Sequence, residues 1–137
     1  MRFLAIYRTP ETGVPPTIEH MTAMGELIDE MTEAGVLLGT EGCLPSAKGA
    51  RVRQSAGKVT VKDGPFTESK EVIGGFALLQ VDSRSEAIEW TRRFLQVAGD
   101  GECELRQLAG PEDFVAAVPP ELQEAEARRR ERMAARR

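Results

Sequence analysis

The fold of this chain is decided by one stretch, Val61-Lys62-Asp63-Gly64-Pro65-Phe66-Thr67-Glu68-Ser69-Lys70-Glu71-Val72-Ile73-Gly74-Gly75-Phe76. Its Asp-Gly-Pro segment predicts a sharp turn, because Gly tolerates positive φ and Pro fixes φ and donates no hydrogen bond. A charged run from Thr67 to Glu71 follows the turn, and the pair Gly74-Gly75 opens an apolar strand. We expect that glycine pair to mark a bulge or a close backbone approach.

Composition limits the classes of protein that this chain can be. Its 137 residues are 41% hydrophobic, which suits one ordinary domain with a tail. The net charge of −4 does not favour nucleic acid or an anionic membrane as a partner. Apolar runs are far shorter than the roughly 20 residues that cross a bilayer, and the first residues lack a signal-peptide pattern. We therefore expect a cytoplasmic protein.

The first half of the chain predicts a strand, a helix and a second strand. Residues 2–7 are apolar and partly aromatic, and residues 8–16 form a loop rich in Pro and Gly. Thr17 is a candidate N-cap for a helix whose apolar positions recur on one face. Gly35 is placed to end that helix in the left-handed conformation, and residues 36–40 continue as a strand toward Leu44.

The second half predicts a hairpin and then another strand, helix and strand. Residues 51–54 and 58–61 alternate polar and apolar side chains around a short turn. A strand over residues 74–81 precedes Ser83, an N-cap that forms a capping-box pattern with Glu86. The last strand covers residues 102–108.

This order predicts an α+β fold of the ferredoxin-like type, βαβ-βαβ with an inserted β-hairpin. Its helices would cover one face of the sheet only. The strand residues do not make the other face clearly polar, and large apolar patches usually mark interfaces. We therefore expect a homodimer whose two sheets pack face to face.

The chain beyond residue 114 differs in composition. Residues 121–137 are rich in Glu, Ala and Arg, with the acidic residues first and the arginines last, which favours a helix by matching its macrodipole. This helix would lack a wide apolar face, so a frayed or protruding helix is favoured over one docked on a partner. We predict two parts, residues 1–114 and a helical tail over residues 115–137.

Several of these motifs together resemble a known family. Asp63-Gly64-Pro65-Phe66, the charged followers, Gly74-Gly75-Phe76 and Glu86-Ala87-Ile88-Glu89-Trp90 are similar to the DGPF branch of the YCII-related proteins over roughly residues 1–114. The resemblance implies a ferredoxin-like fold that pairs as a dimeric α+β barrel. It also implies, for some relatives, an enzyme in which a His and an Asp meet in a cleft. DGPF proteins often accompany sigma factors of the extracytoplasmic-function type, so a partner in such a system is a further expectation.

The resemblance and the residues together give a set of candidate site residues. Asp63 matches the motif Asp, and His20 lies on the first helix, where YCII-like relatives carry their His, so the two are candidates for acid–base catalysis. Phe66, Glu68 and Lys70 are candidate ligand-binding residues on the same loop. Each has a plainer interpretation. Asp63 could form an Asx-turn whose carboxylate accepts from the amides near Phe66, and His20 could be a half-exposed helix residue. Phe66 could anchor the loop in the core, and Glu68 and Lys70 could be solvated loop charges.

We expect neither a cofactor nor a metal. The chain has no phosphate-binding or dinucleotide-binding glycine motif. Cys43 and Cys103 are far apart and suit packed thiols in a reducing compartment, and with His20 they fall short of a zinc site. Two functional classes stay open. One is a cofactor-independent acid–base enzyme, and the other is a non-catalytic dimer that binds a small molecule or a regulatory protein. We expect the small-molecule cleft to be floored by the sheet and to lie near the Asp63–Phe66 loop.

Overall fold

The computed structural model describes residues 1–113 and 118–136, which fall into the units Met1–Gln107 and Leu108–Arg137. The elements are β1 (Arg2–Thr9), α1 (Ile18–Glu33), β2 (Leu37–Gly42), a 3-10 turn (Ser46–Lys48), β3 (Ala50–Ser55), β4 (Lys58–Asp63), β5 (Val72–Gln80), α2 (Arg84–Ala98), β6 (Glu102–Gln107), a second 3-10 turn (Pro111–Asp113) and α3 (Pro120–Ala135).

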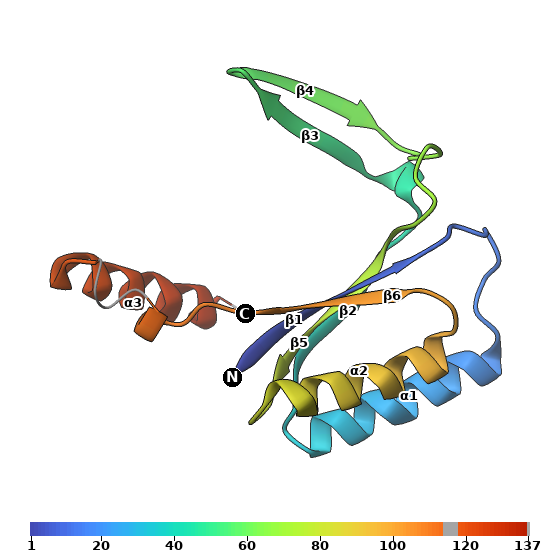
Figure 1. Cartoon of the computed structure of the whole chain (residues 1–137), viewed down its shortest axis with the longest axis horizontal. Helices are drawn as coiled ribbons and strands as arrows, with labels where there is room; N and C mark the ends of the chain where they lie inside the picture. The colour runs from blue at the N-terminus through green and yellow to red at the C-terminus, as the bar shows by residue number, and fades with distance from the viewer. Residues whose placement is uncertain (114–117, 137) are drawn as a thin grey trace. The chain divides into compact units, whose positions relative to one another are not determined.

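The first unit is built on one four-stranded sheet. Its strand order is β2-β5-β1-β6, and each neighbouring pair is antiparallel. Helices α1 and α2 lie together on one face of this sheet (Figure 1). The buried core joins that face to both helices and includes Phe3, Leu27, Leu79 and Ala87. The predicted α+β class is therefore confirmed.

Local capping explains where the two helices begin. The Thr17 side chain accepts a hydrogen bond from the His20 amide at 3.1 Å, and α1 ends before Gly35, whose φ is 72°. At α2, Ser83 Oγ accepts from the Glu86 amide, and the Glu86 carboxylate accepts from the Asp82 amide. The capping box therefore forms with its second bond one residue earlier than the usual pattern.

The glycine pair of β5 lies at a bulge and at a close strand approach. The β1–β5 register shifts between Tyr7 and Arg8, opposite Gly74. At Gly75, a Cβ would lie 2.8 Å from the Glu41 carbonyl oxygen of β2. Both features that we expected of the pair are present, and they leave β2 close against β5.

The other face of the sheet carries an apolar strip. Because side chains alternate along a strand, and Phe3 and Leu79 face the helices, their neighbours Leu4 and Leu78 face away from them. Ile6 and Phe76 pair on this same face, and the Phe76 side chain is exposed. We call this surface the open face.

Strands β3 and β4 form a separate two-stranded sheet, which we call the arm (residues 50–63). They join through Ala56 and Gly57, which both have positive φ, as a tight hairpin turn requires. Val52 pairs with Val61, while Arg51 pairs with Lys62 on the opposite face. Every residue of the two strands is exposed, and the predicted hairpin is confirmed.

The second unit contains the predicted tail helix, α3. It has no buried side chain among its described residues. Ion pairs between turns accompany its charge pattern, such as those of Glu126 with Arg129 and Arg130. The predicted boundary between residues 114 and 115 lies outside the described residues. None of the helices in residues 1–113 and 118–136 is long and apolar enough to cross a membrane.

Candidate functional site

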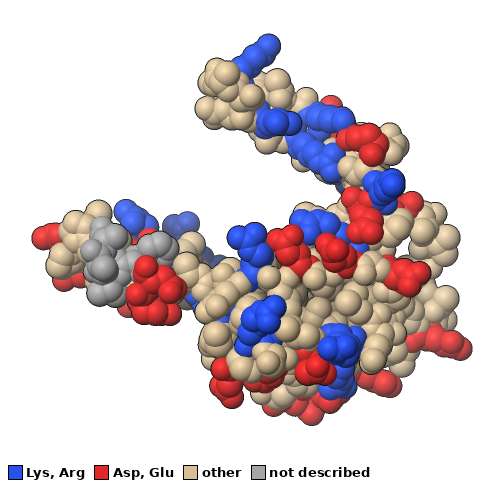
Figure 2. Space-filling model, in the orientation of Figure 1, with Lys and Arg blue, Asp and Glu red and all other residues tan. Residues whose placement is uncertain are grey.

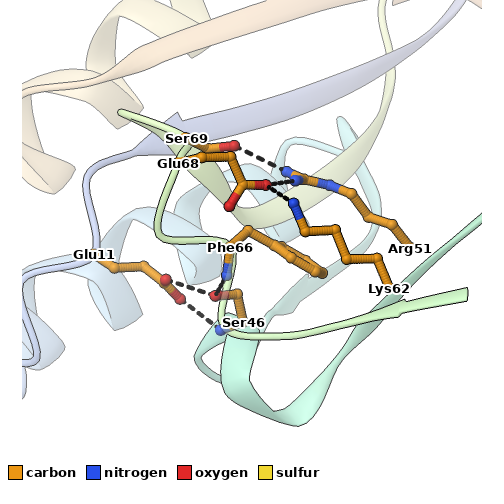
Figure 3. Close-up of polar contacts among 7 residues, drawn as sticks. All are labelled: Glu11, Ser46, Arg51, Lys62, Phe66, Glu68 and Ser69. Carbon is orange, nitrogen blue, oxygen red and sulfur yellow. Dashed lines mark hydrogen bonds and ion pairs between the residues drawn. The ribbon is translucent and has the colours of Figure 1, made fainter.

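One serine ties the Asp-Gly-Pro loop to two other segments. The Glu11 carboxylate accepts hydrogen bonds from the Ser46 amide and from Ser46 Oγ at 2.6 Å. Ser46 Oγ in turn accepts from the Phe66 amide at 3.0 Å (Figure 3). The bonds from the Ser46 hydroxyl and amide hold the pKa of Glu11 below its usual value.

Gly64 is required where this loop crosses the Ser46 turn. A Cβ at Gly64 would lie 1.7 Å from the Ser46 carbonyl oxygen, so no other residue fits without moving the backbone. The Gly64 amide donates to the Gly49 carbonyl at 3.0 Å, and the Gly64–Pro65 peptide bond is cis. The motif therefore fixes a docked loop.

A charged cluster covers the outer side of the same loop. The Glu68 carboxylate pairs with Lys62 at 2.6 Å and with Arg51 at 3.0 Å, and the Arg51 guanidinium also donates to Ser69. That guanidinium lies 3.9 Å from the centre of the Phe66 ring, as in a cation–π contact. The hydrogen bond from Lys62 is the main cause that lowers the pKa of Glu68.

The structure corrects two interpretations of this loop. Asp63 is exposed at the end of β4, and the Phe66 amide donates to Ser46, so the Asx-turn that we expected to use this amide does not form. Pro65 has no amide hydrogen to offer. The Phe66 side chain is only half-buried, beneath Arg51, and is not an anchor in the hydrophobic core. Lys70 is exposed.

A separate cavity of about 630 Å³ lies between the two helices and the sheet. Helix α1 contributes His20 and the apolar side chains of its inner face, such as Met24, and α2 contributes Trp90 and Phe94. Strands β1, β2, β5 and β6 complete the lining. Asp63, Phe66, Glu68 and Lys70 are not among its lining residues.

The three hydroxyl groups of the cavity lining already have partners. The hydroxyls of Tyr7, Thr40 and Thr91 each donate to a backbone carbonyl. Burial raises the pKa of the Cys103 thiol to about 11, with a smaller contribution from Glu102, so this thiol is a neutral group there.

Two side chains of the lining keep free hydrogen-bonding capacity. Among the described residues, the His20 imidazole and the Trp90 indole have no hydrogen bond or ion pair. Glu41 also belongs to the lining, but it pairs with Phe76, so its side chain is on the open face. His20 and Asp63 in particular share neither. The structure thus places His20 at the cavity and Asp63 at the docked loop.

Comparison with known proteins assigns the family. The model of the YCII-related domain matches residues 1–109. The chain belongs to the YCII-related family. The YCII-related chain is also 38% identical over 78 residues to "Uncharacterized protein R00369" of Rhizobium meliloti (strain 1021). That alignment covers 56% of this chain and 63% of the relative.

The cysteines of this YCII-related chain do not behave alike. Cys43 follows β2 and is exposed, which corrects the expectation that both thiols are packed. The hydrogen bond from its amide to the Gly74 carbonyl, at 2.9 Å, extends the backbone pairing of the sheet edge without covering the side chain. Among the described residues, no three His, Cys, Asp or Glu side chains gather in a way that could hold a metal ion.

Sequence reasoning missed two residues that matter in this YCII-related domain. Glu11 and Ser46 meet across 35 positions of the sequence, inside two segments that predict only loops. Only the buried position of Ser46, which a single sequence does not reveal, distinguishes it from an ordinary loop serine.

Proposed function

We propose that this chain binds a small, mainly apolar molecule in the cavity between α1, α2 and the sheet. The observation that carries the proposal is an apolar-lined space of about 630 Å³ whose lining includes the His20 imidazole and the Trp90 indole without hydrogen-bond partners. Ligand sites in proteins commonly have volumes of about 300–1,000 Å³, apolar walls and a few convergent polar groups.

The two free polar groups define the ligand further. An indole N–H donates a hydrogen bond, and an imidazole can donate or accept one. A ligand that fills this space would therefore have an aromatic or aliphatic body and one or two polar atoms, at least one of them a hydrogen-bond acceptor.

The test is a ligand screen with two variants. A panel of small aromatic and aliphatic alcohols, amines and acids is screened by thermal shift, and hits are measured by calorimetry. Ala77→Leu places a larger side chain in the cavity lining, whereas Phe66→Ala alters the docked loop. We expect Ala77→Leu to abolish the ligand-induced shift and Phe66→Ala to preserve it. The opposite pattern would move the site to the loop, and no stabilising compound would refute the proposal.

We further propose that the chain is a homodimer of the dimeric α+β barrel type, within the DGPF branch of its family. The strand order β2-β5-β1-β6 with two helices on one face supports a ferredoxin-like arrangement. The open face, with Leu4, Ile6, Phe76 and Leu78, supports the pairing of two sheets. Light scattering coupled to chromatography measures the mass, and a monomer at all concentrations would refute the dimer.

Acid–base catalysis is the second candidate. The observation that favours it is the unpartnered His20 imidazole at an apolar cavity, where a bound substrate could exchange a proton with it. Asp63 is the proposed second group of the pair. An enzyme of this kind would lose turnover of a cavity ligand on His20→Asn and on Asp63→Asn while still being stabilised by that ligand. Unchanged turnover in either variant would remove that residue from the mechanism.

A further inference from the structure

The arm leaves one apolar face without any cover. Its register places Val52 and Val61 opposite one another, with Val59 two positions before Val61 on the same face of β4. Their side chains are 69%, 65% and 57% exposed, respectively. A lone two-stranded hairpin is marginally stable in water, so a surface that covers this face would stabilise it.

The opposite face of the arm is basic. It carries Arg51, Arg53, Lys58 and Lys62, and Asp63 is the one acidic residue of the arm, so residues 50–63 have a formal charge of +3. Glu68 neutralises Arg51 and Lys62 at the base of the arm. Toward the tip, Arg53 and Lys58 have no ion pair among the described residues.

The rest of the first unit has the complementary charge. We call residues 1–49 and 64–107 the body. It holds fifteen Asp and Glu against eight Lys and Arg, which gives a formal charge of −7. Figure 2 shows Lys and Arg gathered along the arm and Asp and Glu spread over the body.

Helix α1 is the most acidic element of the body. It has five carboxylates and no Lys or Arg, and within residues 1–113 and 118–136 only Glu30 among them has an ion pair, with Arg93. Glu26, Asp29 and Glu33 lie within two turns of one another, and like charges at such spacing repel unless a cation is near. The net positive charge of an arm from a second copy would lessen this repulsion.

We infer that the arm packs its valine face on the body of a second copy of this chain, drawn there by charge. This inference rests on the homodimer proposed above and adds a second contact to it. Two arms packed against each other would bring +3 against +3, whereas an arm on a body brings +3 against −7. Charge therefore selects the body of the second copy over its arm.

The length of the arm fits this position. Strands of six residues span about 20 Å at about 3.3 Å per residue. The arm lies on the side of the sheet opposite α1 and α2 (Figure 1). Paired sheets lie about 10 Å apart and a helix layer adds about 10 Å. An arm that leaves one sheet therefore reaches past the facing sheet to the helix layer of the second copy.

The first test identifies what the arm touches. Equal amounts of ¹⁴N- and ¹⁵N-labelled chain are mixed and treated with a carbodiimide, which joins amines directly to nearby carboxylates. We expect Lys58 to be joined to carboxylates of the body in mixed-isotope pairs, with α1 among the sites. Lys62 is the internal control, because its partner Glu68 belongs to the same chain. A Lys58 link confined to one chain, or a link to Asp63 of another arm, would overturn the inference.

The second test measures the contribution of the valine face. Val59→Ser/Val61→Ser should weaken the dimer by at least about tenfold, equivalent to about 1.4 kcal/mol. Thr60→Ala, on the other face of the same strand, is the matched control and should leave the dissociation constant unchanged. A dimer that the valine variant does not weaken refutes the arm contact and leaves the sheet-to-sheet dimer standing. A wild-type chain that is monomeric at every concentration refutes the dimer itself.

Discussion

Ser46 holds three segments of the chain together, because its amide and hydroxyl serve Glu11 on one side and Phe66 on the other. It is one of two buried polar residues in the described part of the molecule. A buried hydroxyl that accepts and donates at once is costly to replace, since each partner loses a bond that water cannot easily restore.

Ser46→Ala should therefore lower the free energy of unfolding by about 1–3 kcal/mol. The variant keeps the backbone amide bond to Glu11 but removes both bonds of the hydroxyl. Urea unfolding followed by circular dichroism measures the change. Ser69→Ala, which removes only an exposed contact to Arg51, is the control and should cost less than about 0.5 kcal/mol. Equal losses in the two variants would contradict the role of Ser46.

Glu11 should make the docked loop sensitive to acid. Its pKa is lowered in the folded state from an ordinary value of 4.5, so its contribution to stability is complete above that value and is lost as the pH falls through the folded pKa. Between about pH 5 and pH 3 the wild type should lose more stability than Glu11→Gln. Thermal unfolding across this range measures the difference, and parallel curves for the two proteins would contradict it.

At the scale of single residues, sequence predicts local contacts and misses distant ones. Thr17 and Ser83 form the caps that their neighbours predict, because a cap bond spans three positions. Phe66 was expected in the core, yet it is half-buried under Arg51, which comes from a different strand. The Glu11–Ser46 contact has no local signal for the same reason.

Among the elements, β5 needs a glycine at position 75 so that the backbone of β2 can pack close to it. The Glu41 carbonyl occupies the space that a Cβ at Gly75 would need, at 2.8 Å, and both of these positions line the cavity. The pairing of β2 with β5 therefore sets one wall of the proposed binding site.

Gly75→Ala should destabilise the protein by about 1–3 kcal/mol, because β2 must move away from β5 to admit the methyl group. Gly25→Ala makes the same chemical change inside α1, where a Cβ meets no atom within 4 Å, and should stabilise the protein by about 0.5–1 kcal/mol. Chemical denaturation of both variants gives the comparison. Two changes of the same sign would refute this account.

Most elements were predictable because their signals are periodic or lie at their ends. The alternation around Ala56 and Gly57 gave the hairpin, and the Gly74-Gly75 pair gave the bulge. The ends of strands were predicted less accurately than their centres. Strand β1 continues to Thr9 and β5 begins at Val72, beyond the apolar runs that predicted them. Backbone pairing with a neighbour extends a strand past its own pattern.

For the whole molecule, the buried core belongs to the first unit. Its residues come from β1, α1, β5, α2 and the segments beside them, and α3 contributes no buried side chain among those described. Apolar burial is the main source of folding free energy. The stability of the first unit should therefore not depend on α3.

A chain that ends at Asp113 should unfold with the same free energy as the full chain, within about 0.5 kcal/mol. Its helical circular dichroism signal should fall by the share that α3 contributes. Denaturant titration measures the free energy, and the midpoint and slope should match those of the full chain. A marked loss of stability would show that α3 contributes to the fold of the first unit.

At this scale, the order of strands and helices was enough to predict the α+β class. The cavity was not predictable, because Met21, Met24, Ile28 and Met31 give the same periodic pattern whether they fill a core or line a space. In the structure Met31 is buried, whereas Met21 is 52% exposed. Packing between elements decides whether an apolar helix residue is buried or lines a cavity, and the periodicity of one helix does not distinguish the two.

The unequal environment of the two thiols provides a reporter for ligand binding. At neutral pH the Cys103 thiol, with a pKa of about 11, stays protonated and reacts slowly with maleimides, whereas Cys43 is exposed to the reagent. Cys43 directly follows Gly42, which lines the cavity. A fluorophore attached there would report occupancy of the cavity by a change in its emission, in the native sequence and without any engineered cysteine.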